Sequence, residues 1–328
     1  MASNHRDSLW LVTGAAGFIG SNIAEALVRR GERVRVIDNF STGKRGHVRD
    51  FIGKVELVEA DTRDLGAVRR AVSGATHVIH QAALRSVPKS VDVPTETNEI
   101  NVAGTLNVLI AAKEAKVRRV VYASSSSVYG DSKKFPQREE HLPAPISPYA
   151  ASKLAAEHYS VLFTKTYGLE TVSLRYFNVF GPRQDPESLY SAVIPRFMEQ
   201  ALNGEPLTVH WDGRQQRDFT YVDNVVQANL LAATRPGVAG GYFNIANGRT
   251  NSLLDLIRIL EKLVGRKLER VHSPKRAGDV RKTWADIGRA KRALGYKPTV
   301  GFEDGVRKTW EFFSQEFAKA PAGAAQAR

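Results

Sequence analysis

The sequence predicts an α/β protein with a doubly wound parallel sheet, and three observations support this prediction. The first half of the chain repeats a short apolar strand, a polar turn and an amphipathic helix. Several strand segments, such as Val120-Val121-Tyr122-Ala123, are apolar on both faces, which is typical of parallel strands covered by helices. A glycine-rich turn separates the first expected strand from the first expected helix. We therefore expect a central sheet with helices on both sides.

The repeating part of the chain contains six expected strands and four expected helices. The strand segments are rich in β-branched residues and have no interior proline. We expect strands at residues 9–13, 34–38, 55–59, 77–81, 119–124 and 171–176, with helices between them at 18–30, 64–72, 97–115 and 149–167.

The pattern changes after Tyr176, where Pro182, Pro186 and Pro195 interrupt the chain. A helical pattern at 222–233 and a strand pattern at 242–245 return to the earlier style, so two domains interleave in sequence. We expect residues 1–176 and 218–246 in a nucleotide-binding domain, and 177–217 and 247–317 in a smaller α/β substrate domain. Further helices are expected at 252–264, 287–294 and 302–313, and the alanine-rich tail 318–328 is expected to be disordered.

Composition and charge exclude several classes of protein. The 328 residues include no cysteine, which excludes a disulfide, a thiolate metal site and a cysteine nucleophile. The chain has neither a signal-peptide pattern nor an apolar stretch of about 18 residues, so we expect a cytoplasmic protein without a membrane span. The net charge of +13 raises the possibility of nucleic-acid binding, but the basic residues are scattered. We favour a solvated basic surface, and we expect neither a nucleic-acid partner nor a metal.

The glycine-rich turn predicts a dinucleotide site. Gly14, Gly17 and Gly20 lie between the first strand and the first helix, where glycine permits a tight turn and close approach of the backbone to a pyrophosphate. Asp38 ends the second strand, where its carboxylate can accept hydrogen bonds from a ribose and repel a 2′-phosphate. The alternative is that the glycines only pack and Asp38 only caps a turn. We expect a Rossmann-type fold that binds NAD in preference to NADP.

Two residues on one helix face and a serine run indicate the chemistry. Tyr149 and Lys153 are four residues apart, so the phenol and the ammonium can share a pocket. The ammonium, together with a cationic nicotinamide ring, is expected to lower the pKa of the phenol and make it a base. A Tyr-x-x-x-Lys pair alone is usually structural, but the serines at 124–127 end the fifth strand, at the edge of the sheet where ligands bind. Together they fit hydride transfer coupled to proton transfer.

From Leu9 to Phe313 the chain resembles the extended short-chain dehydrogenase/reductase family, and within it the nucleoside-diphosphate-sugar 4-epimerases. The resemblance implies that Ser125, Tyr149 and Lys153 are the catalytic residues. It implies that Asn101 steadies the active-site loop. The complete expected cofactor-binding set is Gly14, Gly17, Phe18, Ile19, Gly20, Asp38, Asn39, Asp61, Thr62, Gln81, Ala82, Ala83, Asn101, Ser124, Tyr149, Lys153 and Tyr176.

The resemblance also implies a site for a UDP-sugar. Asn178, Arg217 and Arg276 resemble the residues that hold the diphosphate, and Asp279 resembles the ligand of the uridine ribose. Either arginine could instead form a surface ion pair. The complete expected substrate-binding set is Arg85, Ser125, Ser126, Tyr149, Asn178, Ala192, Val193, Thr208, His210, Arg217, Arg276, Asp279 and Thr283. Relatives have a small residue where His210 and Trp211 follow the strand that borders the uracil, so contacts specific to uracil are less certain here.

The residues after Ser125 help to choose the reaction. Related dehydratases and decarboxylases carry acidic residues there, whereas this chain has Ser126 and Ser127. This leaves oxidation at C4 followed by return of the hydride, which is a 4-epimerisation. Thr283 resembles a gatekeeper beside C2 of the hexose and is small, so we expect UDP-N-acetylglucosamine and UDP-N-acetylgalactosamine to be accepted alongside UDP-glucose and UDP-galactose.

Three alternatives to this function stay open. They are a UDP-glucuronate 4-epimerase, another NAD-dependent oxidoreductase of sugar nucleotides, and a non-catalytic NAD-binding regulator, although the last would not need Tyr149 and Lys153. The resemblance also implies a homodimer that pairs helices 97–115 and 149–167 across a two-fold axis.

Overall fold

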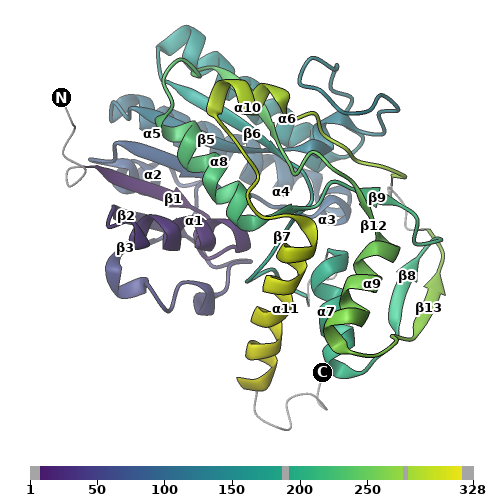
Figure 1. The fold of residues 1–328 in the computed structure, drawn as a ribbon. Coiled ribbons are helices and arrows are strands. Elements are labelled where there is room, and N and C mark those ends of the chain that lie inside the picture. The colour runs from purple at the N-terminus through teal and green to yellow at the C-terminus, as the bar shows by residue number, and fades with distance from the viewer. Residues whose placement is uncertain (1–7, 187–191, 276–279, 320–328) are drawn as a thin grey trace.

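The centre of the molecule is a parallel sheet of seven strands, shown in Figure 1. The computed structural model describes residues 8–186, 192–275 and 280–319. The strand order is β11-β6-β5-β4-β1-β2-β3. The strands are β1 (Leu9–Thr13), β2 (Arg33–Asp38), β3 (Val55–Glu59), β4 (His77–His80), β5 (Arg119–Ser125), β6 (Thr171–Tyr176) and β11 (Gly241–Ile245). The chain runs outward from β1 to β3 and then crosses to β4, so the strand order reverses between β1 and β4. The predicted doubly wound α/β fold is confirmed.

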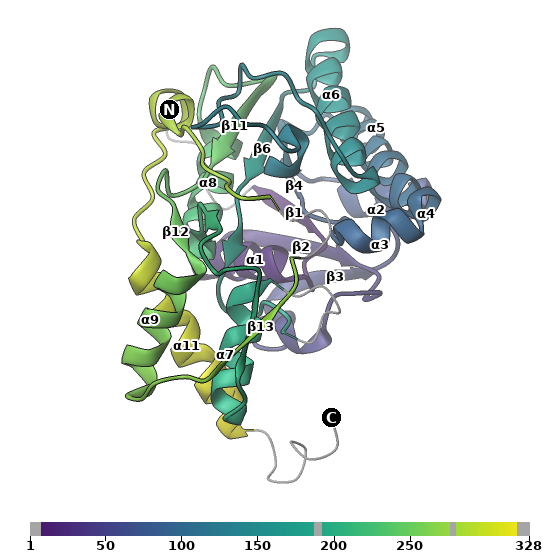
Figure 2. The ribbon, with the colours of Figure 1, turned by 90° about the vertical axis from the view of Figure 1, so that its right-hand side faces the viewer.

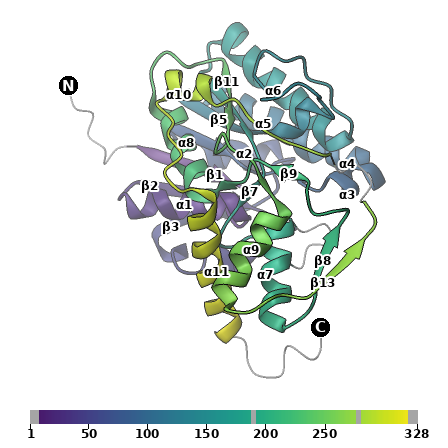
Figure 3. The ribbon, with the colours of Figure 1, turned by 45° about the vertical axis from the view of Figure 1, so that its right-hand side comes forward.

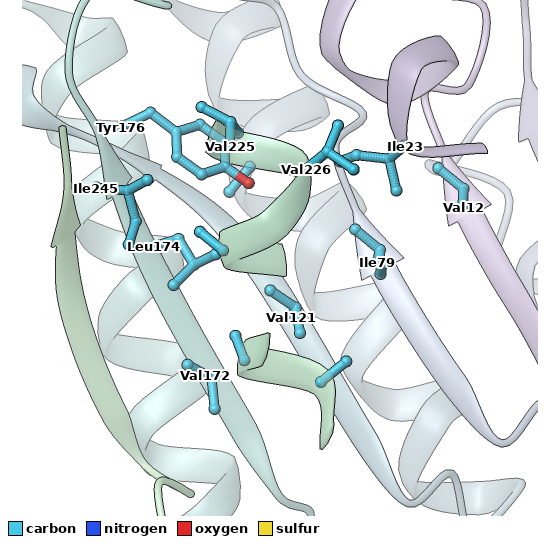
Figure 4. Packing of buried hydrophobic residues seen from close by; sticks show 14 of the residues in the cluster. Val12, Ile23, Ile79, Val121, Val172, Leu174, Tyr176, Val225, Val226 and Ile245 are labelled. Atoms are coloured by element: carbon cyan, nitrogen blue, oxygen red, sulfur yellow. The ribbon is translucent and has the colours of Figure 1, made fainter. Parts of the chain in front are cut away.

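Helices cover both faces of this sheet, as Figure 2 shows. One face carries α1 (Phe18–Arg29) and α8 (Val222–Thr234), and the other carries α2 (Leu65–Val72), α5 (Gly104–Glu114) and α6 (Pro148–Tyr167). The side chains of adjacent residues in one strand pack on opposite faces of the sheet. Val12 packs with Ile23 of α1 and Val226 of α8 (Figure 4), whereas Leu11 packs with the cluster around α2, α5 and α6. Burial on both faces explains why the strand segments are continuously apolar.

The chain before α5 is more helical than expected. Two short helices, α3 (Val87–Asp92) and α4 (Pro94–Asn98), precede a π-helical turn at Glu99–Ala103, which leads directly into α5. The helix expected at 97–115 therefore exists, but helical structure begins ten residues earlier. A π-turn widens the helix locally and is common near functional sites. Here the turn carries the buried Asn101.

A second group of elements lies below the carboxyl end of the sheet, as Figure 3 shows. Its helices α7 (Val193–Asn203), α9 (Leu253–Val264) and α11 (Phe302–Lys319) share an apolar core with β8 (Leu207–His210), which pairs with β13 (Arg270–Ser273). Short strands join this group to the sheet region: β7 (Val179–Phe180) pairs with β10 (Thr220–Tyr221), and β9 (Gln216–Arg217) pairs with β12 (Asn251–Ser252). The small helix α10 (Gly288–Leu294) returns to the sheet at β11. The domain boundaries given above stay a prediction.

Two expectations for this second group were wrong. We expected an irregular segment around Pro195, but α7 starts at Val193 and contains this proline. Proline is tolerated in the first turn of a helix because the backbone N–H groups there have no partner within the helix. Helix α11 extends to Lys319, so the first two residues of the expected disordered tail are helical. The rest of that tail lies outside the described residues.

Candidate active site

A pocket lies where the strand order reverses, at the carboxyl edge of the sheet. It has a volume of about 410 Å³ and is lined by the segments that follow β1, β2, β3, β4, β5 and β6. In an open parallel sheet this crevice is the usual ligand site. A single pocket therefore collects residues from the glycine-rich turn, the end of β2, the serine run and the start of α6.

The glycine-rich turn fits closely between neighbouring segments. Gly14 has φ +66°, and a Cβ on it would lie 2.7 Å from the backbone nitrogen of Ala82. A Cβ on Gly20 would lie 2.1 Å from the carbonyl oxygen of Gly14, an impossible approach. Helix α1 begins after Gly17 without a side-chain cap, so its first N–H groups face the pocket. A bare backbone turn at the start of a helix fits a pyrophosphate.

Asp38 supports the turn and also lines the pocket. Its carboxylate accepts hydrogen bonds from the backbone N–H groups of Ala16 and Phe40, both at 2.8 Å. Burial raises the pKa of Asp38, and the two hydrogen bonds oppose this effect. Asp38 therefore caps backbone turns, as the alternative interpretation of the sequence expected. Contact with a ribose stays a prediction.

Most of the other predicted cofactor residues line the same pocket. They are Phe18, Ile19, Asn39, Asp61, Thr62, Gln81, Ala82, Ala83, Ser124 and Tyr176. Asn101 is different, because it is buried behind the loop after β4 and does not line the pocket. Its side chain accepts from the N–H of Leu84 at 2.7 Å and donates to the carbonyl of Leu84 at 3.1 Å and the hydroxyl of Ser152 at 3.0 Å. Asn101 therefore supports the loop after β4, whose residues line the pocket, and does not line the pocket itself.

The three predicted catalytic residues meet at one side of the pocket. Ser125 ends β5, while Tyr149 and Lys153 lie on successive turns at the start of α6. The Lys153 ammonium donates a hydrogen bond of 2.9 Å to the carbonyl of Ala123 and lies 6.0 Å from the centre of the Tyr149 ring. Ser125 Oγ accepts hydrogen bonds from the backbone N–H and the hydroxyl of Ser127, at 3.2 and 2.8 Å.

The pKa of Tyr149 is higher than we expected from the sequence. Burial raises it, and the hydrogen bond with Ser125 and the charge of Arg85 oppose the increase. Burial also lowers the pKa of Lys153 to about 7. Lys153 is therefore not among the groups that oppose the increase of the Tyr149 pKa, because the burial that disfavours the phenolate also disfavours the nearby ammonium. The expected effect of Lys153 together with a cationic nicotinamide ring stays a prediction. Ser125 and Arg85 are the groups that favour the phenolate.

A second pocket of about 260 Å³ extends the first toward α7 and β8. Asn178 and Val179 line both pockets, so the two are adjacent. The predicted substrate residues that line the second pocket are Asn178, Ala192, Val193, Thr208, His210 and Arg217. Arg85 and Ser126 line the first pocket. Arg276 and Asp279 lie outside the described residues.

Thr283 lies behind Asn178 and does not line either pocket. Its hydroxyl accepts a hydrogen bond of 2.8 Å from the Asn178 side chain, which also donates to the carbonyl of Asp218 at 3.3 Å. Asn178 has φ +36°, so its backbone conformation is unusual for a non-glycine residue. Thr283, the expected gatekeeper, therefore contacts Asn178, which lines both pockets, and any effect of Thr283 on a ligand would act through Asn178.

The chain is similar to known proteins over most of its length. A model of the NAD-dependent epimerase/dehydratase family matches residues 10–246. This chain belongs to that family. Its cofactor is NAD, and the predicted membership of the extended short-chain dehydrogenase/reductase group is confirmed. The prediction of an isomerase is confirmed as well.

Three similar proteins show the range within this epimerase family. UDP-glucose 4-epimerase of Mycolicibacterium smegmatis is 38% identical over 92% of this chain and 97% of its own length. UDP-glucuronate 4-epimerase of Thermodesulfobacterium geofontis is 33% identical over 92% and 94%. The structure of UDP-N-acetylglucosamine 4-epimerase from Methanobrevibacter ruminantium M1, in complex with UDP-N-acetylmuramic acid, superposes with a TM-score of 0.91 at 37% identity and covers 95% of this chain and 99% of that chain.

Several residues that line the first pocket were not predicted from the sequence. Lys44 and His47 follow β2, and Arg183 and Asp185 follow Pro182. Lys44 Nζ lies 2.9 Å from a carboxylate oxygen of Asp185, so two segments 141 residues apart meet at the pocket. The signal that could have found them is the polar loop directly after Asp38. Nothing local in the sequence pairs this loop with Asp185.

In the described part of the chain, no helix is long and apolar enough to cross a membrane. The same residues contain no group of three or more histidine, aspartate and glutamate side chains that could hold a metal ion.

Proposed function

We propose that this chain interconverts the C4 epimers of a UDP-hexose, with NAD held in the first pocket and the UDP group in the second. The observation that supports the proposal most strongly is that Asn178 lines both pockets, and that the first of them is also lined by Ser125, Tyr149 and Lys153. A long ligand with its sugar at these three residues would have its diphosphate near Asn178 and Arg217.

The reaction needs one proton carrier at the sugar. NAD supplies the chemistry of accepting and returning the C4 hydride. Tyr149 takes the proton of the 4-hydroxyl as the sugar is oxidised, and it returns this proton when the sugar is reduced. Ser125 holds the reacting oxygen, and Lys153 contributes positive charge to the same pocket. Between the two half-reactions the 4-keto sugar turns over, so that the hydride returns to the other face.

Two features favour epimerisation over related reactions. Both residues after Ser125 in the pocket are serines, Ser126 and Ser127, which lack the acid or base needed for elimination or decarboxylation. The substrate and the product of an epimerisation are isomers, so the hydride removed in the first half-reaction is returned in the second, the cofactor is regenerated and no second substrate is needed.

We further propose that the 2-acetamido sugars are accepted together with the plain ones. Thr283 is small, and through its hydrogen bond it holds Asn178 at the junction of the pockets. UDP-glucuronate is the second candidate, because Arg85 adds a positive charge to the first pocket and could face a carboxylate. One of the similar proteins is named UDP-glucuronate 4-epimerase.

The test is to incubate the purified protein separately with UDP-glucose, UDP-N-acetylglucosamine and UDP-glucuronate, and to follow the configuration at C4 by proton NMR. We expect the galacto epimers of the first two sugars to form without added NAD. Conversion of UDP-glucuronate alone would replace the proposal with the second candidate. Release of reduced cofactor in step with substrate loss would identify a net oxidoreductase, and no reaction with any sugar would overturn the proposal.

A further inference from the structure

A buried ion pair lies beside the proposed catalytic residues without touching either pocket. Glu157 of α6 and Arg175 of β6 have side chains that are 3% and 2% exposed. Arg175 Nη2 lies 2.6 Å from Glu157 Oε1, and Arg175 Nε donates a second hydrogen bond of 3.0 Å to Glu157 Oε2. The mechanism proposed above uses neither side chain. A buried ion pair is weak evidence for stability, which leaves open why the fold contains this one.

The ion pair contacts the chain on both sides of Ser125. On one side, the hydroxyl of Ser124 donates to Glu157 Oε2 at 2.6 Å. On the other side, the hydroxyl of Tyr129 accepts from Arg175 Nη1 at 2.8 Å and donates to the side-chain oxygen of Asn244 at 2.7 Å. Each of these groups has a partner, so the network is complete and rigid.

The segment between these two contacts determines how the Ser125 hydroxyl points. A short 3₁₀ helix, η5 (Ser126–Tyr129), begins directly after Ser125. Ser125 Oγ accepts the backbone N–H and the hydroxyl of Ser127, so its own hydrogen is left to be donated into the pocket. Tyr149 lines the same pocket, and hydrogen bonding to Ser125 opposes the increase of its pKa that burial causes.

Helix α6 links the same ion pair to the other two catalytic residues. Tyr149, Lys153 and Glu157 are spaced four residues apart, so they follow one another along one side of the helix. Lys153 bonds to the carbonyl of Ala123, and Glu157 bonds to the adjacent Ser124. The helix and the end of β5 are thus joined at two successive residues of the strand.

We infer that Glu157, Arg175 and Tyr129 are positioning residues, which hold η5 against α6 so that Ser125 donates its hydrogen bond to Tyr149. The inference depends on the proposed function for its kinetic consequences. Its geometric part can be tested separately, because the titration of Tyr149 can be measured without any substrate.

The sharpest test is Tyr129→Phe in the NAD-bound protein. The substitution keeps the ring and removes only the oxygen that joins η5 to Arg175. Tyr296→Phe is the matched control, because Tyr296 is fully buried and its hydroxyl donates one hydrogen bond of 2.9 Å to the carbonyl of Ala246, away from Ser125. Both variants lose one buried tyrosine hydroxyl.

The first readout is the pH at which Tyr149 loses its proton, followed by NMR of isotope-labelled tyrosine and assigned with Tyr149→Phe. We expect a higher pH in Tyr129→Phe than in the wild type, and no change in Tyr296→Phe. The second readout is turnover, which should fall about tenfold in Tyr129→Phe with KM changed less than about twofold, since misplaced catalytic groups lower kcat. The rising limb of the pH profile of kcat should move to higher pH.

Ser124→Ala provides a second variant if Tyr129→Phe does not fold, because it removes the contact on the other side of Ser125. It should change the Tyr149 titration in the same direction, and the NAD content is measured in the same samples because Ser124 lines the first pocket. The inference is overturned if the folded Tyr129→Phe or Ser124→Ala protein titrates like the wild type, or if Tyr296→Phe gives the same shift. If the wild type converts no UDP-sugar, the proposed function fails, while the titration still decides this inference.

Discussion

At the scale of single residues, burial has opposite effects on the two ionisable groups of the catalytic pair. It raises the pKa of the Tyr149 phenol and lowers that of the Lys153 ammonium to about 7. Both shifts disfavour charge in the pocket. A positively charged nicotinamide ring would favour the phenolate. We therefore expect Tyr149 to become an effective base only in the NAD-bound protein.

Tyr149→Phe is expected to lower turnover by at least about a hundredfold, since the loss of a general acid–base group typically has an effect of this size. The ring and its packing stay, so the bound NAD and the thermal stability should be unchanged. Turnover can be measured by NMR at C4, and NAD content by its release on denaturation. Near-wild-type turnover would contradict the assignment of Tyr149.

Asp38→Ala should weaken NAD binding by about tenfold and reduce the preference for NAD over NADP, because a charged acceptor for the ribose is lost. The variant also loses two backbone hydrogen bonds, so its thermal stability should be measured in parallel. Binding of both cofactors can be followed by titration calorimetry. An unchanged preference would mean that the ribose lies elsewhere.

Thr283→Tyr tests the accepted sugars. The tyrosine side chain is larger than that of threonine and would displace Asn178 toward the junction of the pockets. Activity on the 2-acetamido sugars should therefore fall at least about tenfold more than activity on the plain sugars. Thr283→Ser is the control, because it keeps a small side chain and a hydroxyl for Asn178. Equal losses on both kinds of sugar, or no acetamido activity in the wild type, would contradict the gatekeeper role.

At the scale of elements, the turn between β1 and α1 depends on the absence of side chains. Its carbonyl and amide groups approach one another so closely that a Cβ on Gly20 would overlap the backbone of Gly14. The same close packing leaves the start of α1 open to the pocket. The turn therefore allows α1 to pack on the sheet, and we expect the same turn to bind NAD.

Gly20→Ala should lower the free energy of unfolding by about 3 kcal/mol, because overpacking at a backbone contact cannot be relieved by a side-chain rotation. NAD binding should be lost with it. Gly53→Ala is the matched control, since a Cβ there meets nothing within 4 Å. Denaturant unfolding and NAD content measure the two effects, and a Gly20→Ala protein that retains both like the wild type would contradict this account.

At the scale of the whole molecule, a helix that covers one face of the sheet exposes several apolar side chains to solvent. Helices α5 and α6 lie side by side on that face (Figure 2), and α6 exposes Tyr159, Leu162 and Tyr167. Other side chains of these helices, such as Leu109 and Phe163, are buried against the sheet. Exposed apolar residues beyond the buried stripe are typical of a helix that also contacts a partner.

A homodimer through α5 and α6 is therefore expected, with a mass twice the 36.2 kDa of the chain. Leu162→Glu should dissociate it, since a charge in an apolar interface is unfavourable. Phe317→Glu is the control, because Phe317 is a similarly exposed apolar residue on α11. Light scattering measures the mass of each variant, and a wild type that shows only the monomer mass at micromolar concentration would refute the dimer.

The positions of the sheet strands along the chain, and many of the residues that line the first pocket, could be predicted from the sequence alone. Strand and helix patterns depend on the alternation of apolar and polar residues, which is local. Gly14, Asp38, Ser125, Tyr149 and Lys153 could be found for the same reason, since each lies at the end of a strand or in the first turns of a helix, where the topology of a parallel sheet brings the ends together.

The tertiary structure alone decided contacts between distant segments. It moved Asn101 behind the loop after β4, and it put Thr283 behind Asn178. It joined Glu157 to Arg175 around Ser125. It also showed that burial raises the pKa of Tyr149, an effect that depends on all the surrounding chain and not on the spacing of Tyr149 and Lys153. Spacing along the sequence carries information about one helix face or one strand end, whereas side chains far apart in the chain meet only through packing.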